Sequence, residues 1–123
     1  MKRVLVIEDN ENNMELITFI LEASNYQTIR AETGQLGVSL ALQERPDFII
    51  LDIQLPDMMG TEVLKLIRSS EIGDRIPIIA MTSYAMAGDR ERLLAEGCDG
   101  YIEKPIDPAT VMTQIHKVVE DSQ

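Results

Sequence analysis

The stretch Asp47–Leu51, with the sequence DFIIL, is followed directly by Asp52 and is the strongest indication of the fold in the chain. Its four consecutive apolar residues predict a strand buried on both faces, as in a parallel sheet covered by helices. A carboxylate at the end of such a strand is costly unless it is paired or bound to a metal ion. The stretch therefore predicts a layered fold and draws attention to Asp52.

Short apolar runs of this kind alternate with longer amphipathic stretches along the chain. The predicted strands are Arg3–Glu8, Tyr26–Ala31, Asp47–Leu51, Pro77–Met81 and Asp99–Glu103. Between them, apolar residues recur at helical spacing, as in the sets Met14, Ile17, Leu21 and Val111, Ile115, Val118. Asn25 and Gly97 suit helix C-terminal turns, whereas Asp107 and Pro108 suit an N-cap and a first helical residue.

Five βα units of this length favour an open sheet over a barrel, which needs eight units and about twice the residues. We expect an α/β fold of three layers: a flavodoxin-like, doubly wound sheet of five parallel strands with five helices. The corresponding strand order is 2-1-3-4-5.

The length and composition of the chain limit the number of domains and the classes of binding partner. With 123 residues, the chain is expected to form one domain over 1–123, without an output domain. A net charge of -10 and a pI near 4.4 disfavour binding to nucleic acid or to anionic membranes. Cys98 is the only cysteine, which excludes an intrachain disulfide and fits a cytoplasmic protein, and no apolar run reaches the length of a membrane span.

Polar residues stand where the predicted strands end: Glu8 and Asp9, Asp52, Thr82, and Lys104. Ligands of such sheets bind beyond the carboxyl ends of the strands. Two carboxylates about 4 Å apart repel by about 4 kcal/mol at an effective dielectric constant of about 20, and a divalent cation would reverse the sign. Oxygen ligands without His or Cys suit Mg²⁺ rather than zinc.

A bound Mg²⁺ with open positions favours a phosphate ligand. Thr82 offers a hydroxyl and Lys104 an ammonium to phosphoryl oxygens, which leaves Asp52 as the nucleophile. The residues themselves thus predict phosphoryl transfer to Asp52.

The ordered set closely resembles the receiver domain of two-component response regulators, a CheY-like family. The set consists of Glu8-Asp9, Asp52 with Pro56 and Gly60, Thr82-Ser83, and Tyr101 followed by Lys104-Pro105. The resemblance covers essentially the whole chain. It implies a phosphoacceptor signalling domain, not a turnover enzyme, that receives its phosphoryl group from a histidine kinase or a histidine phosphotransfer protein.

The resemblance also implies the roles of single residues. Asp9, Asp52 and the backbone carbonyl of Gln54 would ligate Mg²⁺, and Glu8 would act through water. Asp52 would be the phosphoacceptor, assisted by Thr82 and Lys104. The small Ser83 would leave room for the phosphoryl oxygens, and a cis peptide would join Lys104 to Pro105, in keeping with the preference of cis bonds for X-Pro.

Three further expectations follow from the resemblance. Gln54 and Tyr84 would control the access of water to the phosphorylated Asp52. Thr82 and Tyr101 would form the switch that remodels the surface of the fourth helix, fifth strand and fifth helix for a downstream protein target. The run Glu8-Asp9-Asn10 with Asn13 is similar to receivers of hybrid kinases and to stand-alone regulators of the DivK type.

Three other functions share parts of this sequence pattern. Hydrolases of the haloacid dehalogenase type also place an Asp nucleophile after a parallel strand, but they carry a second Asp two residues on, where this chain has Gln54. A flavin or nucleotide binder needs a loop rich in Gly, Ser or Thr after the first strand, whereas residues 9–13 read DNENN. An interaction module without chemistry would not need the complete acidic, hydroxyl and lysine set.

Overall fold

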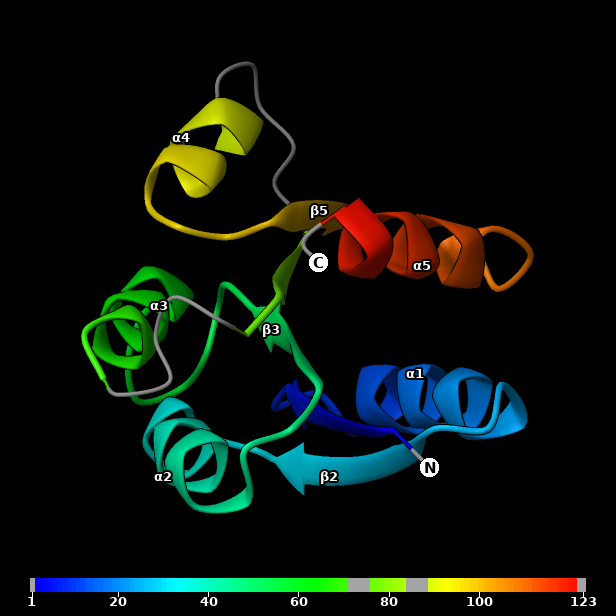
Figure 1. Cartoon of the computed structure of the whole chain (residues 1–123), viewed down its shortest axis with the longest axis horizontal. Helices are drawn as coiled ribbons and strands as arrows, with labels where there is room; N and C mark the ends of the chain where they lie inside the picture. The colour runs from blue at the N-terminus through cyan, green and yellow to red at the C-terminus, as the bar shows by residue number, and fades with distance from the viewer. Residues whose placement is uncertain (1, 71–75, 84–88, 122–123) are drawn as a thin grey trace.

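The computed structural model describes residues 2–70, 76–83 and 89–121, and in it five strands form one parallel sheet (Figure 1). The strand order is β2-β1-β3-β4-β5, as expected for a flavodoxin-like fold. The strands are β1 (Arg3–Ile7), β2 (Gln27–Ala31), β3 (Phe48–Asp52), β4 (Ile78–Thr82) and β5 (Gly100–Glu103). Each predicted strand is confirmed to within one residue at either end.

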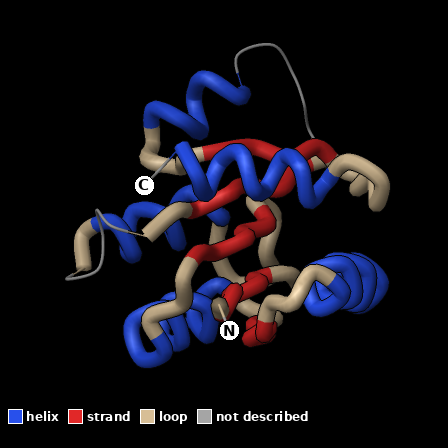
Figure 2. The backbone as a smooth tube through the Cα atoms, turned by 45° about the vertical axis from the view of Figure 1, so that its right-hand side comes forward, coloured by secondary structure: helices blue, strands red, loops and turns tan. Residues whose placement is uncertain are grey.

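Helices cover both faces of the sheet, which gives three layers (Figures 1 and 2). The helices are α1 (Glu11–Ala23), α2 (Gly34–Glu44), α3 (Gly60–Arg68), α4 (Asp89–Ala95) and α5 (Val111–Asp121). Helices α1 and α5 pack on one face, and α2, α3 and α4 on the other. The predicted α/β fold with five helices is therefore confirmed.

The two cores are built from alternate residues of the same strands. In β3, Phe48 and Ile50 face α1 and α5, whereas Ile49 and Leu51 face the opposite helices. All four side chains are completely buried. This double burial explains why the strand reads as an unbroken apolar run, because both faces of its pleat contact helices.

Two of the predicted helix ends, those of α1 and α4, are observed, whereas the predicted start of α5 is not. Asn25 follows α1 with a φ of 70°, and Gly97 follows α4 with a φ of 119°, as the predicted C-terminal turns require. Asp107 caps the backbone as predicted, since its Oδ1 accepts a hydrogen bond from the N–H of Ala109 over 3.0 Å, but α5 begins at Val111 and not at Pro108. The backbone N–H groups of Thr110 and Val111 both donate to the carbonyl of Asp107, so a tight turn precedes the regular helix.

The buried face of α5 differs by one residue from the predicted set of Val111, Ile115 and Val118. Val111 and Ile115 are buried as expected, but the third core residue is Val119, and Val118 is only half-buried. Val118 instead lies against Gly100 of β5, where a Cβ atom would collide with the valine side chain. A glycine at this position therefore lets α5 approach the sheet edge closely.

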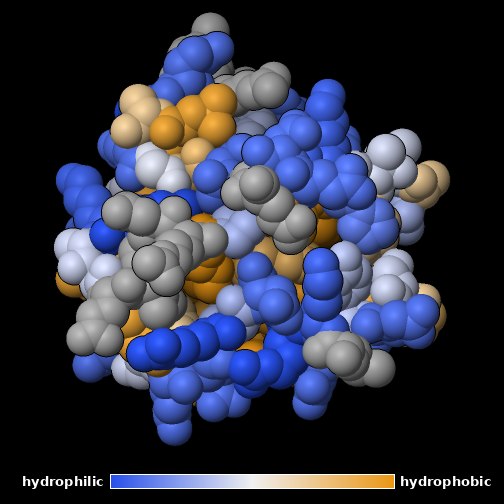
Figure 3. Space-filling model, viewed as in Figure 1, coloured by the Kyte–Doolittle hydropathy of each residue, from blue (hydrophilic) through white to orange (hydrophobic). Residues whose placement is uncertain are grey.

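The surface seen in Figure 3 is mostly hydrophilic, with small hydrophobic areas. The large apolar side chains that are exposed are Phe19, Leu36, Leu42, Met59, Leu66 and Leu94. Among the described residues, no helix combines the length and the apolar character that a membrane crossing requires.

Candidate functional site

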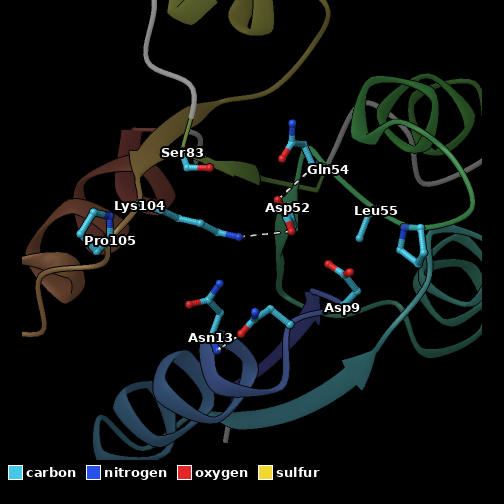
Figure 4. A pocket seen from close by; sticks show the side chains of 10 residues that line it. Asp9, Asn13, Asp52, Gln54, Leu55, Ser83, Lys104 and Pro105 are labelled. Carbon is cyan, nitrogen blue, oxygen red and sulfur yellow. Dashed lines mark hydrogen bonds and ion pairs between the residues drawn. The ribbon is translucent and has the colours of Figure 1, made fainter.

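The polar residues at the strand ends meet at one edge of the sheet, where Asp9, Asp52 and Lys104 border an open hollow of about 580 Å³ (Figure 4). Asp52 is the last residue of β3 and Thr82 the last of β4, while Glu8 follows β1 and Lys104 follows β5. The hollow is lined by Asp9, Asn10, Asn13, Asp52, Gln54, Leu55, Pro56, Ser83, Lys104 and Pro105. Parallel strands bring their carboxyl ends to the same edge, so the predicted convergence is observed.

Three carboxylates form the centre of the site. Glu8, Asp9 and Asp52 each place an oxygen within 4.8 Å of the others. Glu8 is completely buried and Asp52 is 4% exposed, whereas Asp9 is exposed. The backbone N–H of Glu8 donates to the carbonyl of Ala31 at the end of β2, which continues the sheet pairing by one residue and fixes Glu8 at this edge.

Lys104 supplies a cation to this cluster. Its Nζ lies 2.8 Å from Oε1 of Glu8 and 3.2 Å from Oδ2 of Asp52 (Figure 4 shows the second contact). Burial lowers the pKa of Lys104, but the hydrogen bond to Glu8 and the charges of both carboxylates outweigh this effect and leave the pKa raised. The backbone N–H of Lys104 donates to the carbonyl of Thr82, and the expected cis Lys104–Pro105 peptide is present.

The second oxygen of Glu8, Oε2, is buried and has no hydrogen-bond partner among the described residues. Burial, together with the neighbouring Asp52, raises the pKa of Glu8 to about 7. One lysine therefore does not compensate the carboxylates fully. This oxygen-rich set, which contains no His or Cys, fits a hard divalent cation such as Mg²⁺.

The loop between β3 and α3 borders the acidic cluster. The backbone N–H of Gln54 donates to Oδ1 of Asp52 over 3.1 Å, which fixes one carboxylate oxygen. The loop is closed by the hydrogen bond from the N–H of Gly60 to the carbonyl of Ile53 and by a bridge between Gln54 and Met59. The side chain of Gln54 is exposed and lines the hollow.

The predicted hydroxyl and aromatic residues lie on the adjoining strands. Thr82 is 4% exposed at the end of β4, and Ser83 lines the hollow. Tyr101 on β5 is half-buried and packs against the core under α2, α3 and α4. Tyr84 lies outside the described residues. The roles assigned to these residues from the sequence stay predictions.

Asn10 and Asn13 also line the hollow, although the sequence marked them only as signs of a subgroup. Oδ1 of Asn10 accepts a hydrogen bond from the N–H of Asn13 over 3.0 Å and so caps α1. Their position directly after the acidic pair was the signal that could have placed them here.

Comparisons with known proteins agree with this geometry. Residues 4–116 match the family described as response regulator receiver domain. The chain is 43% identical over 121 residues to the polar-differentiation response regulator DivK of Brucella anthropi, which covers 98% of each chain, and it has the same identity and coverage with DivK of Brucella abortus.

Two solved structures extend the comparison. The receiver domain of a sensor histidine kinase from Pseudomonas aeruginosa, crystallised with a magnesium ion in its active-site cleft, has a TM-score of 0.88 and 33% identity. The match covers 97% of this chain and 98% of that one. A CheY-like receiver domain protein from Methanospirillum hungatei has a TM-score of 0.88 and 29% identity, with 99% and 96% of the two chains covered.

Proposed function

Because this chain belongs to the response regulator receiver family, we propose that it accepts a phosphoryl group on Asp52 from a histidine kinase or a histidine phosphotransfer protein. Receiver domains are signalling domains rather than turnover enzymes, and they bind Mg²⁺ at an acidic site. The observation that carries the proposal is the position of Asp52. Its carboxylate borders an open hollow, with Oδ1 bonded to the N–H of Gln54 and Oδ2 beside Lys104.

The proposed reaction moves a phosphoryl group between two side chains. A carboxylate oxygen of Asp52 forms a bond to phosphorus as the bond between phosphorus and the donor imidazole nitrogen breaks. The electron pair of the broken bond stays on the imidazole. Hydrolysis of the resulting acyl phosphate by water later releases inorganic phosphate and restores the carboxylate.

The ligands proposed for Mg²⁺ are the carboxylates of Asp9 and Asp52 and the backbone carbonyl of Gln54, with Glu8 acting through water. The support comes from the three convergent carboxylates and from the buried Oε2 of Glu8, for which the described part of the chain offers no hydrogen-bond partner. When bound, Mg²⁺ supplies positive charge that offsets the negative charge of the phosphoryl oxygens.

Lys104 and Thr82 are proposed to hold the phosphoryl oxygens. Lys104 already contacts Asp52, so its ammonium needs only a small shift to reach an oxygen attached to the phosphorus. Thr82 stands at the end of the neighbouring strand and contributes a hydroxyl donor. The exposed Ser83 beside it is small enough to leave room for the phosphoryl group.

The output is proposed to be a change of protein-binding surface. Phosphorylation adds about -1.5 to -2 charges at Asp52. Thr82 then moves toward the new oxygens, and the space that it leaves allows Tyr101 to turn inward. The surface concerned holds a groove lined from α4, β5 and α5. Among the described residues that line it, the carboxylates of Asp99, Glu103, Asp107 and Asp121 outnumber the single cation, Lys117, which favours a target protein with basic residues.

The test is incubation with acetyl phosphate, with and without Mg²⁺, followed by intact mass measurement and peptide mapping. We expect one Mg²⁺-dependent phosphoryl group on Asp52 and none in Asp52→Asn, because an amide cannot form the acyl phosphate. Asp47→Asn, which changes a carboxylate at the start of β3, is the control and keeps the modification. Phosphorylation at another residue would contradict the proposal.

A further inference from the structure

Asp57 connects the loop between β3 and α3 to a different part of the chain. Its two carboxylate oxygens accept hydrogen bonds from the backbone N–H groups of Gly34, over 2.8 Å, and Gln35, over 2.9 Å. These are the first two residues of α2. We propose that Asp57 is a positioning residue for the metal site: it ties the loop that carries Gln54 to α2 and so holds the carbonyl of Gln54 in place.

The geometry of this contact favours a firm tether. The first N–H groups of a helix have no partner within the helix, and a carboxylate there also interacts favourably with the helix dipole. The bonds from Gln35 and Gly34 lower the pKa of Asp57, so the carboxylate is charged at neutral pH. Two bonds to one charged group restrict its orientation more than a single bond would.

A second residue, Thr33, caps the same helix with a local hydrogen bond. Oγ1 of Thr33 accepts a hydrogen bond from the N–H of Leu36, over 3.1 Å. Thr33 precedes α2 directly, so its bond is local, whereas the bonds of Asp57 span more than 20 residues. The two caps therefore have similar chemistry but different consequences, since of the two only Asp57 comes from the loop.

Two close contacts flank the hydrogen bonds of Asp57, one at the start of α2 and one at the base of the loop. A Cβ atom at Gly34 would lie 2.5 Å from Cγ of Met58, so the start of α2 contacts the loop directly. At the base of the loop, a Cβ atom at Gly60 would lie 2.6 Å from Cα of Ile53. The base is thus fixed within the loop itself, and Asp57 fixes its outer part to α2.

Gln54 lies between these two fixed points. Its N–H is bonded to Asp52, and its strand-like bridge to Met59 couples it to the part of the loop that follows Asp57. Residues that orient a metal ligand change metal affinity on the order of tenfold when they are removed. The inference rests on the proposed function, in which the carbonyl of Gln54 binds Mg²⁺.

The test compares Asp57→Ala with two matched variants by calorimetric Mg²⁺ titration and by amide hydrogen exchange of the metal-free protein. We expect Asp57→Ala to weaken Mg²⁺ binding on the order of tenfold and to accelerate exchange at residues 54–59. Thr33→Ala removes a cap from the same helix and should leave both quantities unchanged. Glu32→Gln removes an exposed negative charge from a second hollow, which Glu8 and Asp9 also line, and so measures the effect of charge alone.

Each other outcome overturns the inference. If Asp57→Ala weakens Mg²⁺ binding no more than Glu32→Gln does, the weaker binding results from the loss of negative charge and not from a displaced Gln54 carbonyl. If Thr33→Ala weakens binding equally, helix stability is responsible. Unchanged amide exchange at residues 54–59 would show that Asp57 does not hold the loop. A wild-type protein that binds no Mg²⁺ would overturn the proposed function as well, which separates the two failures.

Discussion

The ammonium of Lys104 lies 2.8 Å from Oε1 of Glu8, a completely buried carboxylate that stands 96 residues earlier in the chain. The same ammonium contacts Asp52, so one cation serves two buried carboxylates. Removing one partner from a buried ionic cluster leaves the other charges uncompensated. The stability of the metal-free protein should therefore depend on Lys104.

We expect Lys104→Met to lower the free energy of unfolding of the metal-free protein by about 1–3 kcal/mol, measured by urea denaturation. Mg²⁺ should restore part of this loss, because a second cation then compensates the carboxylates. The control is Lys117→Met, which changes an exposed lysine on α5. Equal stability of the two variants would contradict a compensating role for Lys104.

Asp9 should be needed for the metal but not for the fold. Its side chain is exposed, so we expect Asp9→Ala to change the free energy of unfolding of the metal-free protein by less than about 0.5 kcal/mol. The same variant should lose Mg²⁺ binding by calorimetry and Mg²⁺-dependent phosphorylation. Glu11→Ala, two residues later, is the control and should retain both. Unfolding of the metal-free Asp9→Ala protein would indicate a structural Asp9 instead.

The side chain of Gln54 should set the lifetime of the phosphorylated state. It lines the hollow beside Asp52, where we expect it to limit the approach of water, while the bond to Asp52 comes from the backbone and survives substitution. We expect Gln54→Ala to change the rate of spontaneous dephosphorylation without abolishing phosphorylation, and we expect the same of Tyr84→Ala. The measurement is the decay of phosphoprotein after removal of the donor. Unchanged decay in both variants would refute this assignment.

Thr82 should couple phosphorylation to Tyr101. A phosphoryl mimic with Mg²⁺ is expected to shift the NMR amide signals from Thr82 to Ile106, and Thr82→Ala should suppress the shifts near Tyr101 while Asp52 still accepts a phosphoryl group. Inversion of a 1:99 population would require about 5.5 kcal/mol, so we expect a partial shift. Wild-type changes confined to the loops around Asp52 would rule out the switch.

Arg68 should stabilise the end of the sheet opposite to the site. Its guanidinium donates to the carbonyls of Gly97 and Ile76 and to the carboxylate of Asp99, over 2.8–2.9 Å. We expect Arg68→Ala to lower the free energy of unfolding by about 1–3 kcal/mol, because two partly buried carbonyls and a carboxylate lose a charged donor. Lys65→Ala on the same helix should have little effect, and folded Arg68→Ala protein should still be phosphorylated on Asp52. A stability equal to that of Lys65→Ala would contradict this role.

The sequence was most informative where burial leaves a periodic or continuous pattern. The apolar run before Asp52 predicted β3 correctly, because a strand covered on both faces must be apolar at every position. It was less informative about α5, where residues 108–110 form a turn and the regular helix begins at Val111. Similarly, the choice between Val118 and Val119 as a core residue depended on the close approach of α5 to Gly100.

Hydrophobic periodicity and chain connectivity were enough to predict the succession of strands and helices along the chain and the polar residues that end four of the five strands. The packing of the layers was needed to show that Glu8 is buried and paired with Lys104, that Asp57 joins the β3–α3 loop to α2, and that Arg68 connects α3 to the start of β4 and β5. Each of these polar side chains has its partner far away along the chain. Local propensity contains no information about which distant donor or acceptor a charged group will meet, because that choice is fixed by packing of the layers.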